Sequence, residues 1–308
     1  MADFPQASLF QHPEWLDLLA GPGHWEQVVS PGRDGSPEAV WAVTYRPGSG
    51  RKIIQKPPLT PWLGPVFRSP PIHEGKRLSY FKQHLAHLQS QLPSIWMSRQ
   101  TLPPEFLQPQ PFAWLGYELH ERFTYRLDLK QPLPVLWGQL KPALRGRIRK
   151  GEEAVAIVEG WGHKKSVYPA FNATLANKRV GQALGEDAFF KMLQLLENLG
   201  KGRLLTAIDK QGQAKAQVLL VVENGTALAL VIVSAGGQPQ DSYTMPCLLW
   251  SAVQLAAREG LSCFDFEGSM LPGVARFFAA FNATPTPYLE LRRYRNRLVK
   301  AGFALLGR

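Results

Sequence analysis

The order of secondary-structure patterns repeats along the chain. Each half contains, in order, a meander of β-rich runs, a loop, a long helical pattern, a strand, a short helix and a further strand. Alternating apolar and polar residues mark the strands, and apolar residues three and four apart mark the helices. The repeat predicts a duplicated α+β unit, and this order of elements allows mixed sheets with one parallel crossover pair.

The first domain is expected to cover residues 1–130. Its meander consists of β-rich runs separated by turns rich in Pro and Gly, at 25–29, 39–45 and 52–55. A Pro-rich loop, PPLTPWLGPVFRSPP, leads into a predicted helix over 74–91. A strand over 122–129, in which apolar and polar residues alternate, closes this domain.

The second domain is expected to cover residues 131–308. Its meander has three β-rich runs joined by the turns DKQGQ and ENG, at 203–208, 215–222 and 227–234. A helix is predicted from about Pro246 to Glu259, because proline is favoured near a helix start and Gly260 follows its end. Strands over 261–267 and 288–292, a short helix between them and a terminal helix complete the pattern.

The junction of the halves, 131–150, is expected to form a basic connecting helix. Apolar residues recur every four positions, at Leu136, Leu140, Leu144 and Ile148. Basic residues lie between them, at Lys141, Arg145, Arg147, Arg149 and Lys150. Two interpretations stay open. The basic side is a solvated face of a docking helix, or it is a wall for phosphates or RNA.

Charge and composition narrow the class of protein. The chain of 308 residues carries a net charge of +11 and has a pI near 9.7, which favours anionic partners. No apolar run approaches the roughly 20 residues of a membrane span, and the start lacks a signal-peptide pattern, so a cytoplasmic protein is expected. Cys247 and Cys263 lie in apolar stretches, as buried free thiols do.

Several stretches together resemble FemAB-like proteins of the GNAT (acyl-CoA N-acyltransferase) superfamily. They are LFQHPEWLDLL, LTPWLGPVF, RFTYRLDL, LWGQLKPALRGRIRK and, the most specific, CFDFEGSMLPGVARFFAAFNATPTPYLEL. This superfamily includes methicillin-resistance-type and peptidoglycan-bridge aminoacyltransferases. The resemblance implies tandem GNAT-like domains and transfer of an acyl or aminoacyl group to a small-molecule or peptide amine. Acyl-CoA or charged tRNA is the implied donor.

The resemblance also points to a pyrophosphate-binding loop between a strand and its helix, where backbone N–H groups hold the anion. The corresponding stretch is SAGGQPQDSYTMPC, with Gly236, Gly237 and Gln238 as cofactor-binding candidates. It has two glycines but departs from the spacing of the usual motif. The long coiled-coil insertion of some bridge-forming relatives is absent from the sequence.

The strand over 261–267 supplies the main catalytic candidates. Direct N-acylation needs a base for the attacking ammonium and donors for the developing oxyanion. Asp265 and Glu267 are two residues apart, so a regular strand would project them from one face, one as base and the other as an anchor for the substrate amine. A second interpretation has Glu267 and Ser269 capping the following helix, with Ser269 otherwise available to substrate.

Further candidates lie in loops and on a strand. Tyr243 can act as an acid, and Tyr288 can donate a hydrogen bond unless it is a core residue. Trp62 and Gly64 can form a wall for substrate or simply pack the loop, and Lys56 can meet an anion or remain solvated. The seven histidines show no metal-ligand spacing, so no metal is expected. The alternative function is a non-catalytic GNAT-like module that binds an anionic ligand or RNA.

Overall fold

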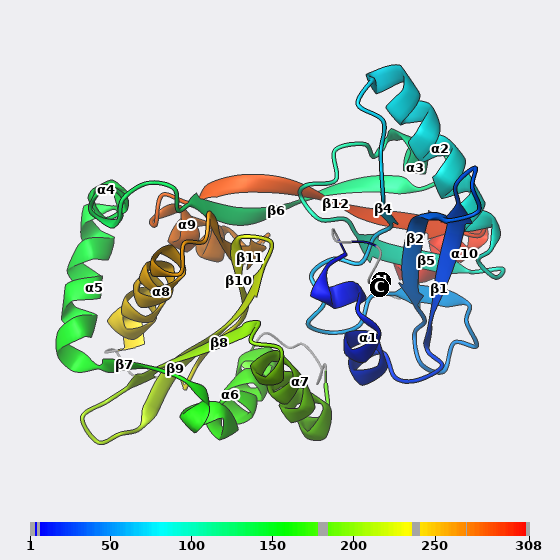
Figure 1. Cartoon of the computed structure of the whole chain (residues 1–308). Coiled ribbons are helices and arrows are strands. Elements are labelled where there is room, and N and C mark those ends of the chain that lie inside the picture. Colours follow the sequence, from blue (N-terminus) through cyan, green and yellow to red (C-terminus); the bar gives the residue numbers. More distant parts are fainter. Residues whose placement is uncertain (1–3, 5–6, 178–183, 236–240, 269, 306–308) are drawn as a thin grey trace. The chain divides into compact units, whose positions relative to one another are not determined.

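The computed structural model describes residues 4, 7–177, 184–235, 241–268 and 270–305. The chain divides into two compact units. Unit 1 consists of Met1–Arg122 and Pro287–Arg308, and unit 2 of Phe123–Thr286. Figure 1 shows the elements of both units, and each unit is described by itself below.

Unit 2 contains a mixed sheet in the order β6-β11-β10-β9-β8-β7. Its strands are β6 (Glu118–Asp128, which enters from unit 1), β7 (Ala156–Glu159), β8 (Gly202–Ile208), β9 (Ala214–Glu223), β10 (Thr226–Ser234) and β11 (Cys263–Gly268). All neighbours pair antiparallel except β10 and β11, which pair parallel. A parallel pair needs a crossover connection, and the helix α8 (Asp241–Arg258) provides it.

Helices cover both faces of this sheet (Figure 1). Neighbouring residues of β9 show the two faces, because successive side chains of a strand point in opposite directions. Val218 lies in the apolar cluster formed with α8, whereas the side chain of Gln217 donates to the carbonyl of His163, just before α6. The remaining helices of the unit are α4 (Leu133–Gln139), α5 (Pro142–Ala154), α6 (Lys164–Asn177), α7 (Glu186–Asn198) and α9 (Pro272–Ala279).

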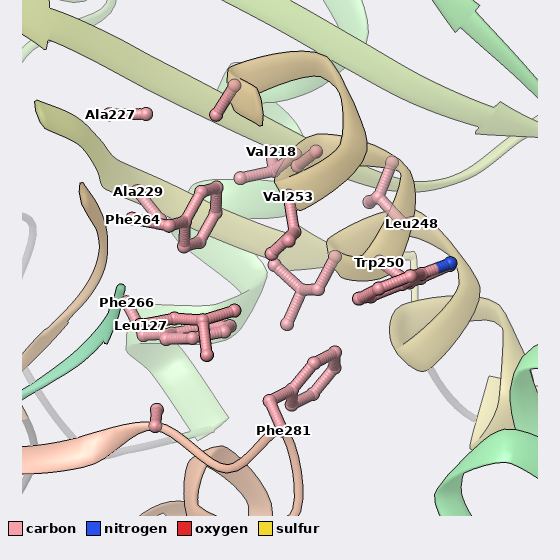
Figure 2. Close-up of a cluster of buried hydrophobic side chains, with 14 of the residues drawn as sticks. Leu127, Val218, Ala227, Ala229, Leu248, Trp250, Val253, Phe264, Phe266 and Phe281 are labelled. Carbon is pink, nitrogen blue, oxygen red and sulfur yellow. The ribbon is translucent and has the colours of Figure 1, made fainter. Parts of the chain in front are cut away.

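The largest apolar cluster lies between the sheet of unit 2 and α8 (Figure 2). Phe264 and Phe266 of β11 are almost fully buried there, and the ring of Phe266 contacts those of Phe278 and Phe281 at centroid distances of 5.0 and 5.1 Å. Asp265 lies between the two phenylalanines in sequence, so its side chain points to the opposite face of the sheet. The aromatic cluster therefore fixes the orientation of β11.

Unit 1 contains a three-stranded sheet, β1-β2-β4, and the strands β3-β5-β12-β6. Its strands are β1 (Trp25–Pro31), β2 (Pro37–Thr44), β3 (Ile53–Gln55), β4 (Val66–Phe67), β5 (Met97–Thr101) and β12 (Thr284–Tyr294). Its helices are α1 (Pro13–Leu19), α2 (Glu74–Ser90), α3 (Gln110–Trp114) and α10 (Arg297–Leu305). Trp41, Phe112 and Leu291 are fully buried in its core.

The two units share a topology, which agrees with the expected duplication. In unit 1, β3 and β5 pair parallel over three residue pairs and are joined through α2; in unit 2, β10 and β11 do the same through α8. Each unit is then completed by a strand from the other half of the sequence. β5 pairs with β12, and β11 pairs with β6.

This exchange of strands changes the division of the chain. We expected domains of 1–130 and 131–308, whereas the compact units place Phe123–Lys130 in unit 2 and Pro287–Arg308 in unit 1. The physical reason is the antiparallel pairing of β12 with β5, which carries the C-terminal segment into unit 1. The junction 131–150 lies wholly within unit 2.

Prolines account for two differences between expected and observed helices. The predicted continuous helix over the junction is two helices, because Pro142 occupies the first turn of α5, where its missing N–H costs nothing. Conversely, Pro246 lies inside α8, which begins at Asp241. The four expected apolar positions of the junction are all buried, so the pattern located the buried face correctly while missing the break.

Candidate functional site

The strands β10 and β11 stop pairing soon after they begin. Their register covers Thr226↔Cys263, Ala227↔Phe264 and Leu228↔Asp265, although β10 continues to Ser234. Leu230 is an extra residue against β9, because Ala229 and Val231 face the consecutive residues Leu220 and Leu219. Such a β-bulge bends and twists its strand. Within the described residues, no strand pairs with 229–234 of β10 on the side of β11.

A second bulge lies in β11 at Glu267. Asp265 pairs with Arg126 and Gly268 pairs with Thr124, so two residues of β11 face the single residue Tyr125. Glu267 has a φ of 62°, in the left-handed region that costs a residue with a side chain about 1–3 kcal/mol. The strand is therefore not regular here, and the expectation that Asp265 and Glu267 project from one face fails at this bulge.

Asp265 is fully buried and holds the bulge. One carboxylate oxygen accepts hydrogen bonds from the hydroxyl of Thr124 and from the backbone N–H of Glu267, the latter at 2.9 Å. The other oxygen is 2.7 Å from Nε of Arg126. Buried charges need such partners, because an unpaired carboxylate would be strongly destabilising. These contacts fix the Asp265 carboxylate between β11 and β6, and Glu267, which is half-buried, is the second carboxylate where β10 and β11 diverge.

Tyr243 lies in α8 and is half-buried. Its backbone carbonyl faces α5 at Gly151, where a Cβ atom would come within 2.6 Å of the carbonyl oxygen and 2.5 Å of Cβ of Cys247. Glycine at 151 therefore allows α5 and α8 to pack closely beside Tyr243. Burial, together with the charge of Glu152, raises the pKa of Cys247 to about 11, so this thiol stays protonated at neutral pH.

Four of the candidate residues lie outside the described residues. They are Gly236, Gly237 and Gln238 of the expected pyrophosphate loop, and Ser269. Of the unit 2 candidates that are described, Asp265 and Glu267 are brought together by the hydrogen bond across the bulge.

The Pro-rich loop of unit 1 is tied down by hydrogen bonds. Nζ of Lys56 donates to the carbonyls of Thr60 and Pro61 at 2.8 and 2.9 Å. The ring of Trp62 packs edge-on against Phe10, and a Cβ at Gly64 would come within 2.6 Å of the side chain of Leu102. These contacts give Lys56, Trp62 and Gly64 packing roles within the loop.

This loop occupies in unit 1 the position where the strands part in unit 2. β3 and β5 pair up to Gln55↔Arg99, and beyond that point the loop bonds to β5 instead. The backbone N–H of Leu63 donates to the carbonyl of Thr101 at 2.9 Å, and the hydroxyl of Thr101 donates to the carbonyl of Pro61 at 2.5 Å. The parallel pair of unit 1 is thus closed by its own chain.

Tyr288 is half-buried on β12, within unit 1. The same strand carries a charged cluster that the sequence analysis missed: Glu290 with Arg99, Arg122 and Arg292. Burial alone would raise the pKa of Glu290, but hydrogen bonds from Arg99 and Arg292 and the charge of Arg122 lower it to about 2. Residues from β5, β6 and β12 meet here, and only the alternation of charged and apolar residues in ELRRYR hinted at a charged face.

The described residues contain no group of three or more His, Cys, Asp or Glu side chains placed to hold a metal ion. They also contain no helix with the length and apolar character needed to cross a membrane.

Comparison with known proteins identifies the fold. A scan of protein-family models and a search of curated proteins found no match. Among solved structures, FemX matches with a TM-score of 0.66 and 11% identity over 93% of this chain and 92% of that one. L-PGS from Bacillus licheniformis matches with a TM-score of 0.58 and 13% identity over 92% and 88%.

A third solved structure is that of a tandem GNAT protein. A tandem GNAT protein from the clavulanic acid biosynthesis pathway matches with a TM-score of 0.52 and 12% identity, over 92% of this chain and 94% of that one. These matches agree with the two parallel crossover pairs, one in each unit. The chain therefore has the FemAB-like tandem GNAT fold.

Proposed function

We propose that the protein transfers an acyl group from acyl-CoA to a small-molecule or peptide amine at the end of β11 in unit 2. The divergence of β10 and β11 after Leu228 and Asp265 carries this proposal. Along the side of β10 that faces β11, no strand among the described residues pairs with 229–233, and backbone N–H and C=O groups at such a strand edge can pair with an extended ligand, as strands do with added peptides. The pantetheine arm of coenzyme A is extended and contains amides, so it can pair with residues 229–234 of β10.

Glu267 is the proposed base. Its strained backbone supports this role, because strain of this kind accumulates at functional sites where the surrounding structure enforces it. Glu267 accepts a proton from the attacking ammonium, and the amine nitrogen then forms a bond to the carbonyl carbon as the thioester C–S bond breaks. Tyr243 is the proposed donor of a proton to the leaving thiolate, and its tyrosinate then takes up the second proton that the amine nitrogen loses as it becomes an amide. Asp265 holds the bulge that positions Glu267.

The donor is tested by calorimetric and thermal-shift titration of the full chain with acetyl-CoA and longer acyl-CoAs, at low and high salt. A ligand that binds the folded state raises its stability. Saturable binding that survives high salt supports an acyl-CoA donor. Absence of binding would overturn it, and binding of charged tRNA in a parallel titration would then assign the aminoacyl-transfer version of the reaction.

The base is tested with the variant Glu267→Gln, by following release of free coenzyme A in the presence of a panel of amines. We expect turnover to fall by about 10²-fold or more, the size typical of general-base catalysis, while the Kd for acyl-CoA changes little. Glu267→Gly relieves the positive φ and should lose turnover to the same degree without losing stability. Turnover that persists in both variants would refute the assignment.

A further inference from the structure

Three arginines surround one buried carboxylate in unit 1. Nη2 of Arg99 lies 3.0 Å from Glu290 Oε2, Nη2 of Arg122 lies 3.3 Å from Oε1, and Nε of Arg292 donates to Oε1 at 2.6 Å. The side chain of Glu290 is 6% exposed, whereas those of Arg99, Arg122 and Arg292 are 44%, 28% and 27% exposed. The carboxylate is thus enclosed, whereas part of each arginine side chain remains accessible.

The cluster carries excess positive charge. Three guanidinium groups against one carboxylate leave a net charge of +2. On β6, the carboxylate of Glu118 is itself paired with Lys300. Each guanidinium has five N–H donors in a planar fork, and the contacts to Glu290 use only one or two of them. Donors and charge are therefore available for a further anion.

The duplicated fold provides an internal comparison. The third pair of the parallel strands is Gln55↔Arg99 in unit 1 and Leu228↔Asp265 in unit 2. Across the neighbouring strand, Arg99 faces Arg292, whereas Asp265 faces Arg126. At equivalent positions, unit 2 has a neutral ion pair and unit 1 has two cations. The excess charge is therefore not a requirement of the fold.

We propose that Arg99, Arg122 and Arg292 form a binding site for the phosphate group of a phosphomonoester. A phosphomonoester carries a charge of about −1.5 to −2 at pH 7, which matches the net charge of the cluster, whereas a single carboxylate would leave one cation uncompensated. Guanidinium forks also match the geometry of phosphate oxygens. The residues of this site belong to unit 1, whereas the acyl transfer is proposed for unit 2.

The probes are glycerol 3-phosphate and adenosine monophosphate, with succinate as a carboxylate control, titrated calorimetrically into the full chain at constant ionic strength. Each phosphate probe carries one phosphomonoester, so comparable affinities indicate recognition of the phosphate alone. Tighter binding of glycerol 3-phosphate would identify the ligand as a glycerol-phosphate headgroup, and tighter binding of adenosine monophosphate would identify it as a nucleotide. Binding of succinate as tight as that of both phosphates would overturn the proposal, as would the lack of binding by either phosphate.

The variant Arg99→Gln should weaken phosphate binding about tenfold, because it removes one charged, bidentate donor. The matched control is Arg51→Gln, which also removes a half-exposed arginine of unit 1 paired with a glutamate, Glu26. Equal weakening by both variants would show a general charge effect and refute the site. If Arg99→Gln unfolds, Arg99→Lys keeps the charge and loses the fork; unchanged affinity in that variant would also count against the proposal.

Discussion

Replacing Asp265 by Asn tests whether this buried carboxylate stabilises unit 2. Asn keeps the size of the side chain but removes its charge. One carboxylate oxygen is replaced by an NH2 group, which would face the hydrogen-bond donors of Thr124, Glu267 or Arg126 and cannot accept from them. Removing one partner of a buried ion pair typically costs about 3–5 kcal/mol. Because 18% of the Arg126 side chain stays in contact with water, we expect a loss at the lower end, about 3 kcal/mol.

The assay is urea unfolding followed by circular dichroism, with hydrogen exchange of the β6 and β11 amides to locate the effect. A loss of 3 kcal/mol should lower the urea midpoint by roughly 1–3 M, since m-values are about 1–3 kcal/mol/M. Asp128→Asn is the matched control: it makes the same change on β6 at an exposed residue whose carboxylate accepts a hydrogen bond from the backbone N–H of Lys130. We expect this control to stay within about 0.5 kcal/mol of the wild type.

Two results would refute the reasoning. A midpoint of Asp265→Asn equal to that of Asp128→Asn would show that the ion pair contributes nothing to stability. Wild-type stability combined with lost turnover would make Asp265, rather than Glu267, the base in the proposed reaction.

Two further predictions concern packing and pH. Gly151→Ala should lower the free energy of unfolding by about 1–3 kcal/mol, because its methyl group would overlap Cys247 and the Tyr243 carbonyl. Gly146→Ala, in the same helix, meets nothing within 4 Å and should raise the free energy of unfolding by about 0.5–1 kcal/mol. Urea unfolding in which both variants change stability in the same direction would contradict this. Glu290 has a pKa of about 2 against a usual value of 4.5, so its ionised form contributes about 3 kcal/mol, fully present above pH 4.5 and lost as pH falls through 2. Glu290→Gln should therefore lose most stability at pH 7 and little near pH 2, and a pH-independent difference in unfolding free energy would contradict that.

Local patterns predicted the elements well where the periodicity was uninterrupted. The helix expected over 74–91 is α2, Glu74–Ser90, and the meander of the second half is β8, β9 and β10. The tandem GNAT fold, expected from the resemblance, is confirmed by the solved structures. Periodicity describes only neighbours in sequence, so it could not show that β12 returns to pair with β5.

For the same reason, the sequence could suggest candidate site residues but not their surroundings. Asp265 and Glu267 could be chosen as candidates because both are carboxylates at a strand end, but their different environments depend on Arg126 and on a bulge. Arg126 and Asp265 are 139 positions apart in the sequence, and the pairing of β6 with β11 brings them together. A left-handed Glu267 also has no sequence signal, because that region usually requires glycine and Gly268 is the next residue. The arginine cluster combines β5, β6 and β12, so a linear reading misses it.

The exchange of strands also sets an order of events during synthesis on the ribosome. Residues 1–122 emerge first, but β5 lacks its partner β12 until residues 284–294 have been made. All of Phe123–Thr286 is synthesised in the interval, and an unpaired strand edge is a template for aggregation. If Phe123–Thr286 folds first, the loop that must close when β12 pairs with β5 becomes effectively shorter. A chain that ends before residue 287 would therefore lack its C-terminal residues, and its N-terminal part would also become less soluble.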